Sequence, residues 1–352
     1  MTPPVTRVRR PPRARGAAVP GGNHRPHRAP QSPSTDPLHR PPPEIHRSPP
    51  QIRDEARMTG DIPFGEAEAS LTAEVLREVL AGGAEAFARL TSDEGAVDDF
   101  GFDPELTDDY LLPALRLLYE KYFRVDLEGL ENVPAEGGAL LVANHSGTLP
   151  LDALMLQVAL HDHHSTHRRL RLLAADLAFD LPVVRDLARK AGHVRACPEN
   201  ALRLLGSGEL VGVMPEGYKG LGKPFEERYR LQRFGRGGFA AVALRSRRPM
   251  VPCSIVGAEE IYPMIGSAPT LARMLKLPYF PITPTFPLLG ALGLIPMPTK
   301  WTIRFGAPIH TDGFPEDAAE DPLVVEKLAG EVKDTIQHTL NEMLEGRGSP
   351  FV

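Results

Sequence analysis

The stretch Leu140-Leu-Val-Ala-Asn-His-Ser-Gly-Thr-Leu-Pro-Leu-Asp152 joins a short apolar run to a polar end. Residues 139–143 predict a short buried strand that ends at Asn144. His145 follows at once, and the apolar residues after Asp152 predict a helix. A histidine at the end of a strand, with a carboxylate seven residues further on, can serve as a general base held in one tautomer by its partner. A histidine in this position is also common as a purely structural residue.

A second stretch, Leu210-Val-Gly-Val-Met-Pro-Glu-Gly-Tyr-Lys219, is again a buried strand running into a polar corner. The corner offers the carboxylate of Glu216, the open backbone of Gly217 and the cation of Lys219. In an open α/β sheet, corners of this kind line the crevice in which ligands bind. The two stretches therefore predict one site at one edge of a sheet.

Strands and helices alternate along the rest of the chain. Further strands are predicted at 124–130, 171–174, 250–255 and 301–305, and helices at 70–90, 105–123, 183–191, 199–205, 234–245 and 322–344. This order is typical of an α/β fold, and we expect a mixed central sheet with helices on both faces. The expected domains are a tail at 1–57, a helical region at 58–123 and an α/β domain at 124–352.

The tail differs sharply in composition from the rest of the chain. Fourteen of the 37 prolines lie in residues 1–57, together with eleven arginines and four acidic residues. Such a segment cannot offset its ordering entropy by burial, so we expect disorder, and it contains no apolar core of a secretory signal peptide. With a net charge of −5 for the whole chain, residues 58–352 carry −12. An acidic body argues against a nucleic-acid partner. Two cysteines, Cys197 and Cys253, are typical of a reducing compartment.

Residues 277–299 form an uncharged run of 23 residues, long enough to suggest a membrane span. The run contains six prolines, each of which removes a backbone donor and disrupts a helix. A span in lipid must satisfy its backbone internally, so a transmembrane helix is disfavoured. Two interpretations remain: an apolar loop packed on the body, or a surface that enters the membrane interface.

The two polar corners together resemble the glycerolipid acyltransferase family, the lysophospholipid acyltransferases that include bacterial 1-acylglycerol-3-phosphate acyltransferase. The first block of that family is Asn-His, four residues and Asp, and its third is an apolar strand ending in Pro-Glu-Gly. Here these blocks are Asn144-His145 with Asp152, and Val213-Met-Pro-Glu-Gly217, about 70 residues apart. The resemblance covers residues 105–345.

Two departures from the family pattern stand out. Six residues, 146–151, separate His145 from Asp152, and Tyr218-Lys219 stand where the family often has Thr-Arg. Lysine keeps the cation but loses bidentate recognition of phosphate. The first block looks closer to the branch resembling monoacylglycerol and diacylglycerol acyltransferases.

The resemblance implies transfer of a fatty acyl group from an acyl thioester, either acyl-CoA or acyl carrier protein, to a hydroxyl of a glycerolipid. His145 would be the general base and Asp152 its partner, with Asn144, Glu216, Gly217 and Lys219 as substrate-binding residues. No bound cofactor and no metal are implied. The partners would be membrane lipids and the thioester, at the inner face of the cytoplasmic membrane. The acceptor stays open between lysophosphatidic acid, another lysophospholipid, and mono- or diacylglycerol.

Two alternatives belong to other functional classes. The first is a lipid-binding or scaffold protein with a weakened site, favoured by the longer interval between His145 and Asp152. The second is a P-loop NTPase, since Gly217-Tyr-Lys-Gly-Leu-Gly-Lys223 has the spacing of a phosphate-binding loop. Pro224 then stands where that loop needs serine or threonine. A histidine cluster at 161–167 offers possible metal ligands, but its polar surroundings favour an ordinary loop.

Overall fold

The run 139–143 forms strand β2 (Ala139–Ala143) in the computed structural model, which describes residues 66–91, 96–146, 148–180 and 182–349. All of these residues lie in one unit of the chain, Ile62–Val352. The predicted tail at 1–57 lies outside the described residues.

β2 lies in the middle of a seven-stranded sheet of order β1-β9-β6-β2-β5-β3-β4. β6, β2, β5, β3 and β4 are parallel to one another, whereas β9 runs antiparallel to β6 and β1 is parallel to β9. The mixed sheet expected from the sequence is therefore confirmed. Its remaining strands are β1 (Asp126–Glu128), β3 (Leu170–Ala174), β4 (Val194–Arg195), β5 (Leu210–Val213), β6 (Met250–Val256) and β9 (Thr302–Phe305).

Every residue of β2 is buried, because the sheet is covered on both faces. Ala139, Leu141 and Ala143 belong to one hydrophobic core, and Leu140 and Val142 belong to the other. Side chains alternate between the faces of a strand, so one continuous apolar run serves both cores. This double burial explains why β2 appears in the sequence as an unbroken hydrophobic stretch.

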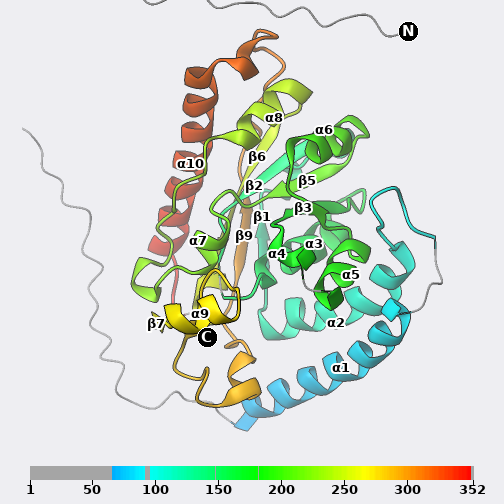
Figure 1. The fold of residues 1–352 in the computed structure, drawn as a ribbon, viewed down its shortest axis with the longest axis vertical. Coiled ribbons are helices and arrows are strands. Elements are labelled where there is room, and N and C mark those ends of the chain that lie inside the picture. Colours follow the sequence, from blue (N-terminus) through cyan, green and yellow to red (C-terminus); the bar gives the residue numbers. More distant parts are fainter. Residues whose placement is uncertain (1–65, 92–95, 147, 181, 350–352) are drawn as a thin grey trace, which may run out of the picture. The chain divides into compact units, whose positions relative to one another are not determined.

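Helices form the two outer layers. α10 runs along one side of the sheet and α2 and α3 lie on the other, while α6 and α8 share the core of α10 (Figure 1). The α-helices are α1 (Glu66–Thr91), α2 (Leu112–Leu117), α3 (Leu151–His163), α4 (Leu177–Asp180), α5 (Pro182–Lys190), α6 (Pro198–Gly206), α7 (Tyr218–Leu221), α8 (Gly238–Ser246), α9 (Pro269–Met274) and α10 (Pro322–Glu345). Short 3-10 turns occupy Leu130–Asn132, Phe225–Glu227, Ala258–Glu260, Gly290–Leu294 and Ala318–Glu320.

The helical region before the sheet is continuous with the main core. α2 is flanked by π-helical segments at Leu106–Leu111 and Leu118–Tyr122, in place of the regular helix predicted at 105–123. Pro113 lacks the N–H that a regular helix would use there, which fits a widened turn. Phe123 stacks on Trp301 with ring centroids 4.5 Å apart, so this region packs against the end of β9. A domain boundary at 123 stays a prediction.

The long helix α10 and the buried strands of the sheet agree with the sequence prediction, whereas the shortest elements do not appear in it. α10 has the predicted extent within one residue, whereas α8 begins at Gly238 instead of at 234. Gly237 precedes α8 with a positive φ of 74°, and this left-handed residue separates the helix from the preceding loop. The four-residue helices α4 and α7 and the two-residue strand β4 carry too little periodicity to be predicted.

The connection from β6 to β9 contains the uncharged run, and we call residues 261–300 the β6–β9 insertion. It holds α9 and a small two-stranded sheet of β7 (Gly266–Ser267) and β8 (Pro281–Ile282). Its backbone is thus broken into short pieces, as the six prolines predict. Among the residues that the structure describes, no helix has both the length and the apolar character that crossing a bilayer requires.

Candidate active site

Three neighbouring parallel strands, β6, β2 and β5, bring their carboxyl ends to the same edge of the sheet. His145 follows β2, Glu216 follows β5 and Glu259 follows β6. The two sequence stretches therefore meet in space, as expected from the placement of ligand crevices in α/β sheets. Glu259, which joins them from β6, was not predicted.

His145 and Asp152 form a hydrogen-bonded pair. The His145 Nδ1 lies 2.8 Å from Asp152 Oδ2, and the aspartate is fully buried. Because a carboxylate accepts hydrogen bonds, this contact assigns the proton of the neutral imidazole to Nδ1 and leaves a lone pair on Nε2. The pair thus has the geometry of a general base with its orienting partner.

Asp152 is itself fixed by the loop and helix around it. Its Oδ2 also accepts from the Ser146 N–H at 2.8 Å, and its Oδ1 accepts from the Ala153 N–H at 2.8 Å. Asp152 lies in the first turn of α3, which begins after Pro150. The contact between His145 and Asp152 is therefore made across the six-residue interval, so the length of the interval no longer favours a weakened site.

Glu216 is engaged internally through both carboxylate oxygens. Oε1 accepts from the backbone N–H of His145 at 3.0 Å, and Oε2 accepts from the Gln232 N–H at 2.6 Å. The side chain is completely buried and lies 3.5 Å from the Lys223 ammonium. These bonds hold the backbone of His145 in place, which makes Glu216 a positioning residue.

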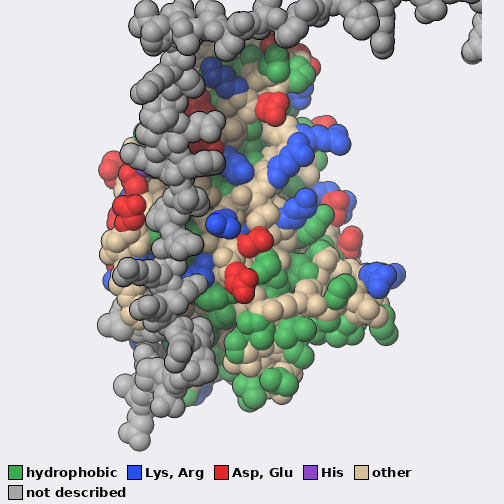
Figure 2. Space-filling view, turned by 90° about the vertical axis from the view of Figure 1, so that its left-hand side faces the viewer, with side chains coloured by type: hydrophobic (Ala, Val, Ile, Leu, Met, Phe, Trp, Pro, Cys, Tyr) green, Lys and Arg blue, Asp and Glu red, His purple; other side chains and the backbone are tan. Residues whose placement is uncertain are grey.

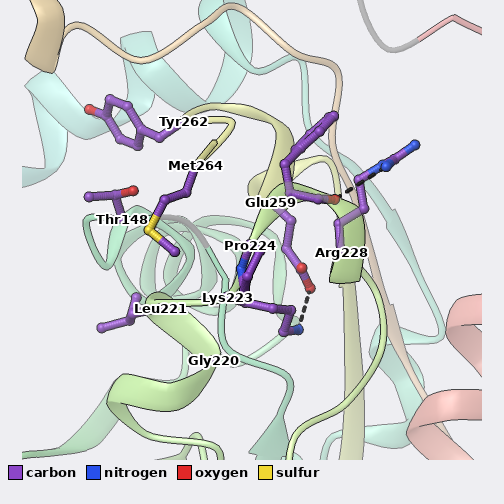
Figure 3. Close-up of a pocket in the computed structure, with 10 residues that line it drawn as sticks. Thr148, Gly220, Leu221, Lys223, Pro224, Arg228, Glu259, Tyr262 and Met264 are labelled. Carbon is purple, nitrogen blue, oxygen red and sulfur yellow. Dashed lines mark hydrogen bonds and ion pairs between the residues drawn. The ribbon is translucent and has the colours of Figure 1, made fainter. Parts of the chain in front are cut away.

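Lys223 links the ends of β5 and β6. Its Nζ lies 3.1 Å from Glu259 Oε1, and both side chains are almost fully buried (Figure 3). Burial raises the pKa of Glu259 to about 7, against the opposing effect of Lys223. A lysine held by two carboxylates is not free to bind a nucleotide phosphate, so this geometry does not support the P-loop alternative.

The remaining predicted site residues have different surroundings. Asn144 is buried and bonds to both backbone groups of Ile255 on β6, at 3.0 and 2.7 Å, which makes it a link between strands. Gly217 has φ 56° and ψ −145°, a backbone region that favours glycine, and its N–H donates to Met214 O. Lys219 is exposed on α7.

Two pockets lie beside this network. A narrow one of about 10 Å³ is bounded by Thr148, Glu259, Tyr262 and Met264, and it has room for about one water molecule (Figure 3). The larger has about 280 Å³ and is lined by residues that include Lys219 and Gln232. His145 lines neither pocket, although Gly220, which borders the narrow one, packs directly against it.

The β6–β9 insertion reaches the site through Tyr279. Its hydroxyl donates to the carbonyl of Thr148 at 2.9 Å, in the loop between His145 and Asp152. Burial and the neighbouring Asp152 carboxylate raise the pKa of this phenol. Tyr279 also lines the larger pocket, so the uncharged run contributes directly to the surroundings of the site.

Other reactive side chains have structural partners. His164 bonds to Val133 O at 3.0 Å, His167 bonds to His161 O at 2.8 Å, and His163 stacks on Tyr119. No metal-binding group of histidine, cysteine and acidic residues occurs in the part of the chain that the structure describes. Cys253 is buried in β6, and burial raises the pKa of its thiol, which keeps it protonated and unreactive.

Comparison with known proteins assigns the chain to a family. The model of the Acyltransferase family matches residues 124–256. An uncharacterized protein of Mycobacterium tuberculosis is 58% identical over 263 residues, which are 75% of this chain and 73% of that protein. A bovine protein named "DGAT1/2-independent enzyme synthesizing storage lipids" is 24% identical over 62% of this chain and 59% of its own length.

Among solved structures, the comparison found the 1-acyl-sn-glycerophosphate acyltransferase PlsC of Thermotoga maritima. It covers 80% of this chain and 97% of its own length, with 19% identity and a TM-score of 0.48. The family match spans both polar corners, and the mycobacterial relative extends the similarity well beyond them. The chain therefore belongs to the acyltransferase family.

Proposed function

We propose that the protein transfers a fatty acyl group from an acyl thioester to a hydroxyl of a glycerolipid, with His145 as general base. The observation that carries the proposal is the 2.8 Å contact between His145 Nδ1 and the buried Asp152 at the carboxyl edge of the sheet. This contact directs the basic Nε2 away from Asp152. Membership of the acyltransferase family supplies the reaction class.

In the proposed step, the acceptor hydroxyl attacks the thioester carbonyl while Nε2 takes its proton. The carbon–sulfur bond then breaks, and the imidazolium returns the proton to the leaving thiolate. Asp152 stabilises the imidazolium between these two transfers. Positioned proton transfer of this kind contributes about 10²–10⁴-fold to the rate.

An exposed cation beside the larger pocket favours a substrate with an anionic head group. Lys219 is exposed at the pocket of about 280 Å³, which makes it our proposed contact with the substrate. In this proposal Asn144, Glu216 and Gly217 do not contact the substrate directly. They hold the backbone at the ends of β2 and β5 in place. The donor is acyl-CoA or acyl carrier protein, and no bound cofactor takes part in the step. The proposed partners are membrane lipids, so the reaction would take place at the inner face of the cytoplasmic membrane.

The test is thiol release from an acyl-CoA by the purified full chain, with lysophosphatidic acid or monoacylglycerol as acceptor. We expect His145→Ala to lower kcat by about 10²–10⁴-fold. The matched control is His310→Ala, which removes an exposed histidine outside the site and should leave the rate unchanged. Preference for the phosphate-bearing acceptor, lost in Lys219→Ala, would assign the lysine to the head group.

Equal thiol release by wild type and His145→Ala would refute the proposed role of the histidine. Lipid binding without any turnover by the wild type would instead favour the scaffold alternative.

A further inference from the structure

The β6–β9 insertion concentrates exposed apolar side chains. Among the described residues, ten large hydrophobic side chains are more than half exposed, and six of these belong to the insertion. They are Ile265, Met274, Leu275, Leu288, Leu289 and Leu292, with Leu288 exposed to 84%. Hydrophobic side chains gather at the lower end of the face in Figure 2, the end at which α9 lies in Figure 1. A concentration of exposed apolar side chains in one segment is typical of an interaction site.

The charges of the insertion are of one sign. No acidic residue occurs between Glu260 and Asp312, although residues 58–352 as a whole carry −12. Arg273 and Lys276 are exposed next to the apolar side chains, whereas Lys300 pairs with Asp126. The apolar surface is therefore edged by cations, which complement anionic lipid head groups. A second copy of this chain would bring the same cations toward one another.

The insertion is also joined to the site. Tyr279 bonds to the loop between His145 and Asp152, and Met264 O accepts from the Phe225 N–H at 2.9 Å, close to Lys223. The pocket of about 280 Å³ is lined by Pro278 and Tyr279 from the insertion and by Lys219 from α7. A surface bound by the insertion therefore lies next to the pocket.

From these observations we infer that the β6–β9 insertion docks the protein on a membrane surface that contains anionic lipid. The six apolar side chains enter the boundary between head groups and acyl chains, and Arg273 and Lys276 contact the phosphates. The inference rests on the proposed function, since it supplies the route by which a lipid acceptor reaches the site. Apolar contact provides most of the binding because the rest of the body is acidic.

The test is co-sedimentation of the full chain with vesicles of phosphatidylcholine, with and without phosphatidylglycerol. We expect the triple variant Leu288→Ser, Leu289→Ser, Leu292→Ser to bind both vesicles about 100-fold more weakly. The double variant Arg273→Gln, Lys276→Gln should bind vesicles that contain phosphatidylglycerol about 30-fold more weakly than the wild type does. Its binding to pure phosphatidylcholine vesicles should be unchanged. These side chains are exposed, so circular dichroism should show unchanged folding.

The matched control is Leu323→Ser, which replaces a leucine of α10 that is 75% exposed and should leave vesicle binding unchanged. His145→Ala should bind vesicles like the wild type, which separates docking from turnover. Loss of thiol release in His145→Ala with intact vesicle binding supports both proposals. Vesicle binding without any turnover by the wild type supports the docking surface and contradicts the proposed function.

Equal vesicle binding by the triple variant and the wild type would overturn the inference and assign docking to another segment, such as the basic residues 1–57. Failure of the wild type to sediment with anionic vesicles would overturn it as well. A dimer of the wild type that the triple variant breaks, without vesicle binding, would identify a second copy as the occupant.

Discussion

His145 is held at two points by two different carboxylates. Asp152 fixes the ring through Nδ1, and Glu216 fixes the backbone through the N–H of the same residue. Glu216 is in turn balanced by Lys223, which also pairs with Glu259. The ring and the backbone of the proposed base are thus coupled to a buried ion network that spans the ends of three strands.

Glu259 makes the stability of the protein depend on pH. Its pKa is raised from 4.5 to about 7 by burial, so the folded chain keeps a proton that the unfolded chain loses near 4.5. The contribution of Glu259 to the free energy of unfolding should therefore fall as pH rises through this interval, by about 3 kcal/mol in total. Burial lowers the pKa of His193 to about 4, which changes stability in the opposite sense below pH 6.5. The Glu259 contribution is therefore measured as the difference between wild type and Glu259→Gln in urea unfolding from about pH 5 to pH 8.

The exposed Glu345 at the end of α10 provides the comparison for Glu259. Glu345→Gln should keep the pH slope of the wild type. An identical slope in wild type and Glu259→Gln would show that another group carries the dependence.

Sequence reasoning found the pair of His145 and Asp152 because both residues belong to one short motif. It missed the contact between Lys223 and Glu259, since these residues follow different strands and no fixed spacing connects them. From the sequence, Glu216 was expected to bind the substrate. In the structure both of its carboxylate oxygens accept hydrogen bonds from the backbone N–H groups of His145 and Gln232. Residue types at a site are visible in a sequence, but hydrogen-bond partners depend on strand order.

At the scale of elements, α7 packs closely against His145 because Gly220 has no side chain. A Cβ at Gly220 would lie 2.9 Å from His145 O and 2.9 Å from Glu216 Cβ, closer than real side chains approach. Gly220→Ala should therefore lower the free energy of unfolding by about 1–3 kcal/mol. Displacement of His145 should also slow thiol release by about tenfold or more. Urea unfolding and the thioester assay measure the two effects.

Gly330 in α10 supplies a control of opposite sign. A Cβ there meets nothing within 4 Å, and alanine favours a helix by about 1 kcal/mol over glycine. Gly330→Ala should thus be as stable as the wild type or more so. Equal stability of Gly220→Ala and the wild type would show that α7 can shift without cost.

The long elements were predictable because their hydrophobic periodicity extends over several turns. α10 carries one buried stripe from Val325 to Met343, and α3 follows the predicted pattern after Asp152. The short helices α7 and α9 owe their conformation to packing, since isolated helices of a few residues are not stable. Their positions were therefore not predictable from propensity.

At the scale of the whole molecule, Trp301 joins the helical region to the sheet. It is fully buried, stacks on Phe123, and donates its indole N–H to Thr299 Oγ1 at 3.1 Å. Trp301→Ala should lower the free energy of unfolding by about 3–5 kcal/mol, measured by urea denaturation. Trp301→Phe keeps a ring against Phe123 and should be less destabilised, and a Trp301→Ala variant as stable as the wild type would refute this role.

The mixed fold followed from the alternation of strands and helices, but the direction of β9 did not. β9 runs opposite to β6, so the chain that leaves β6 at the carboxyl edge re-enters the sheet at that same edge. A parallel neighbour would have forced the chain to cross to the far edge before returning. One reversed strand therefore turns the whole connection into a loop that begins and ends beside the reacting groups. Its length can vary at a cost of about 0.6 kcal/mol per doubling, without a change in the sheet beneath it.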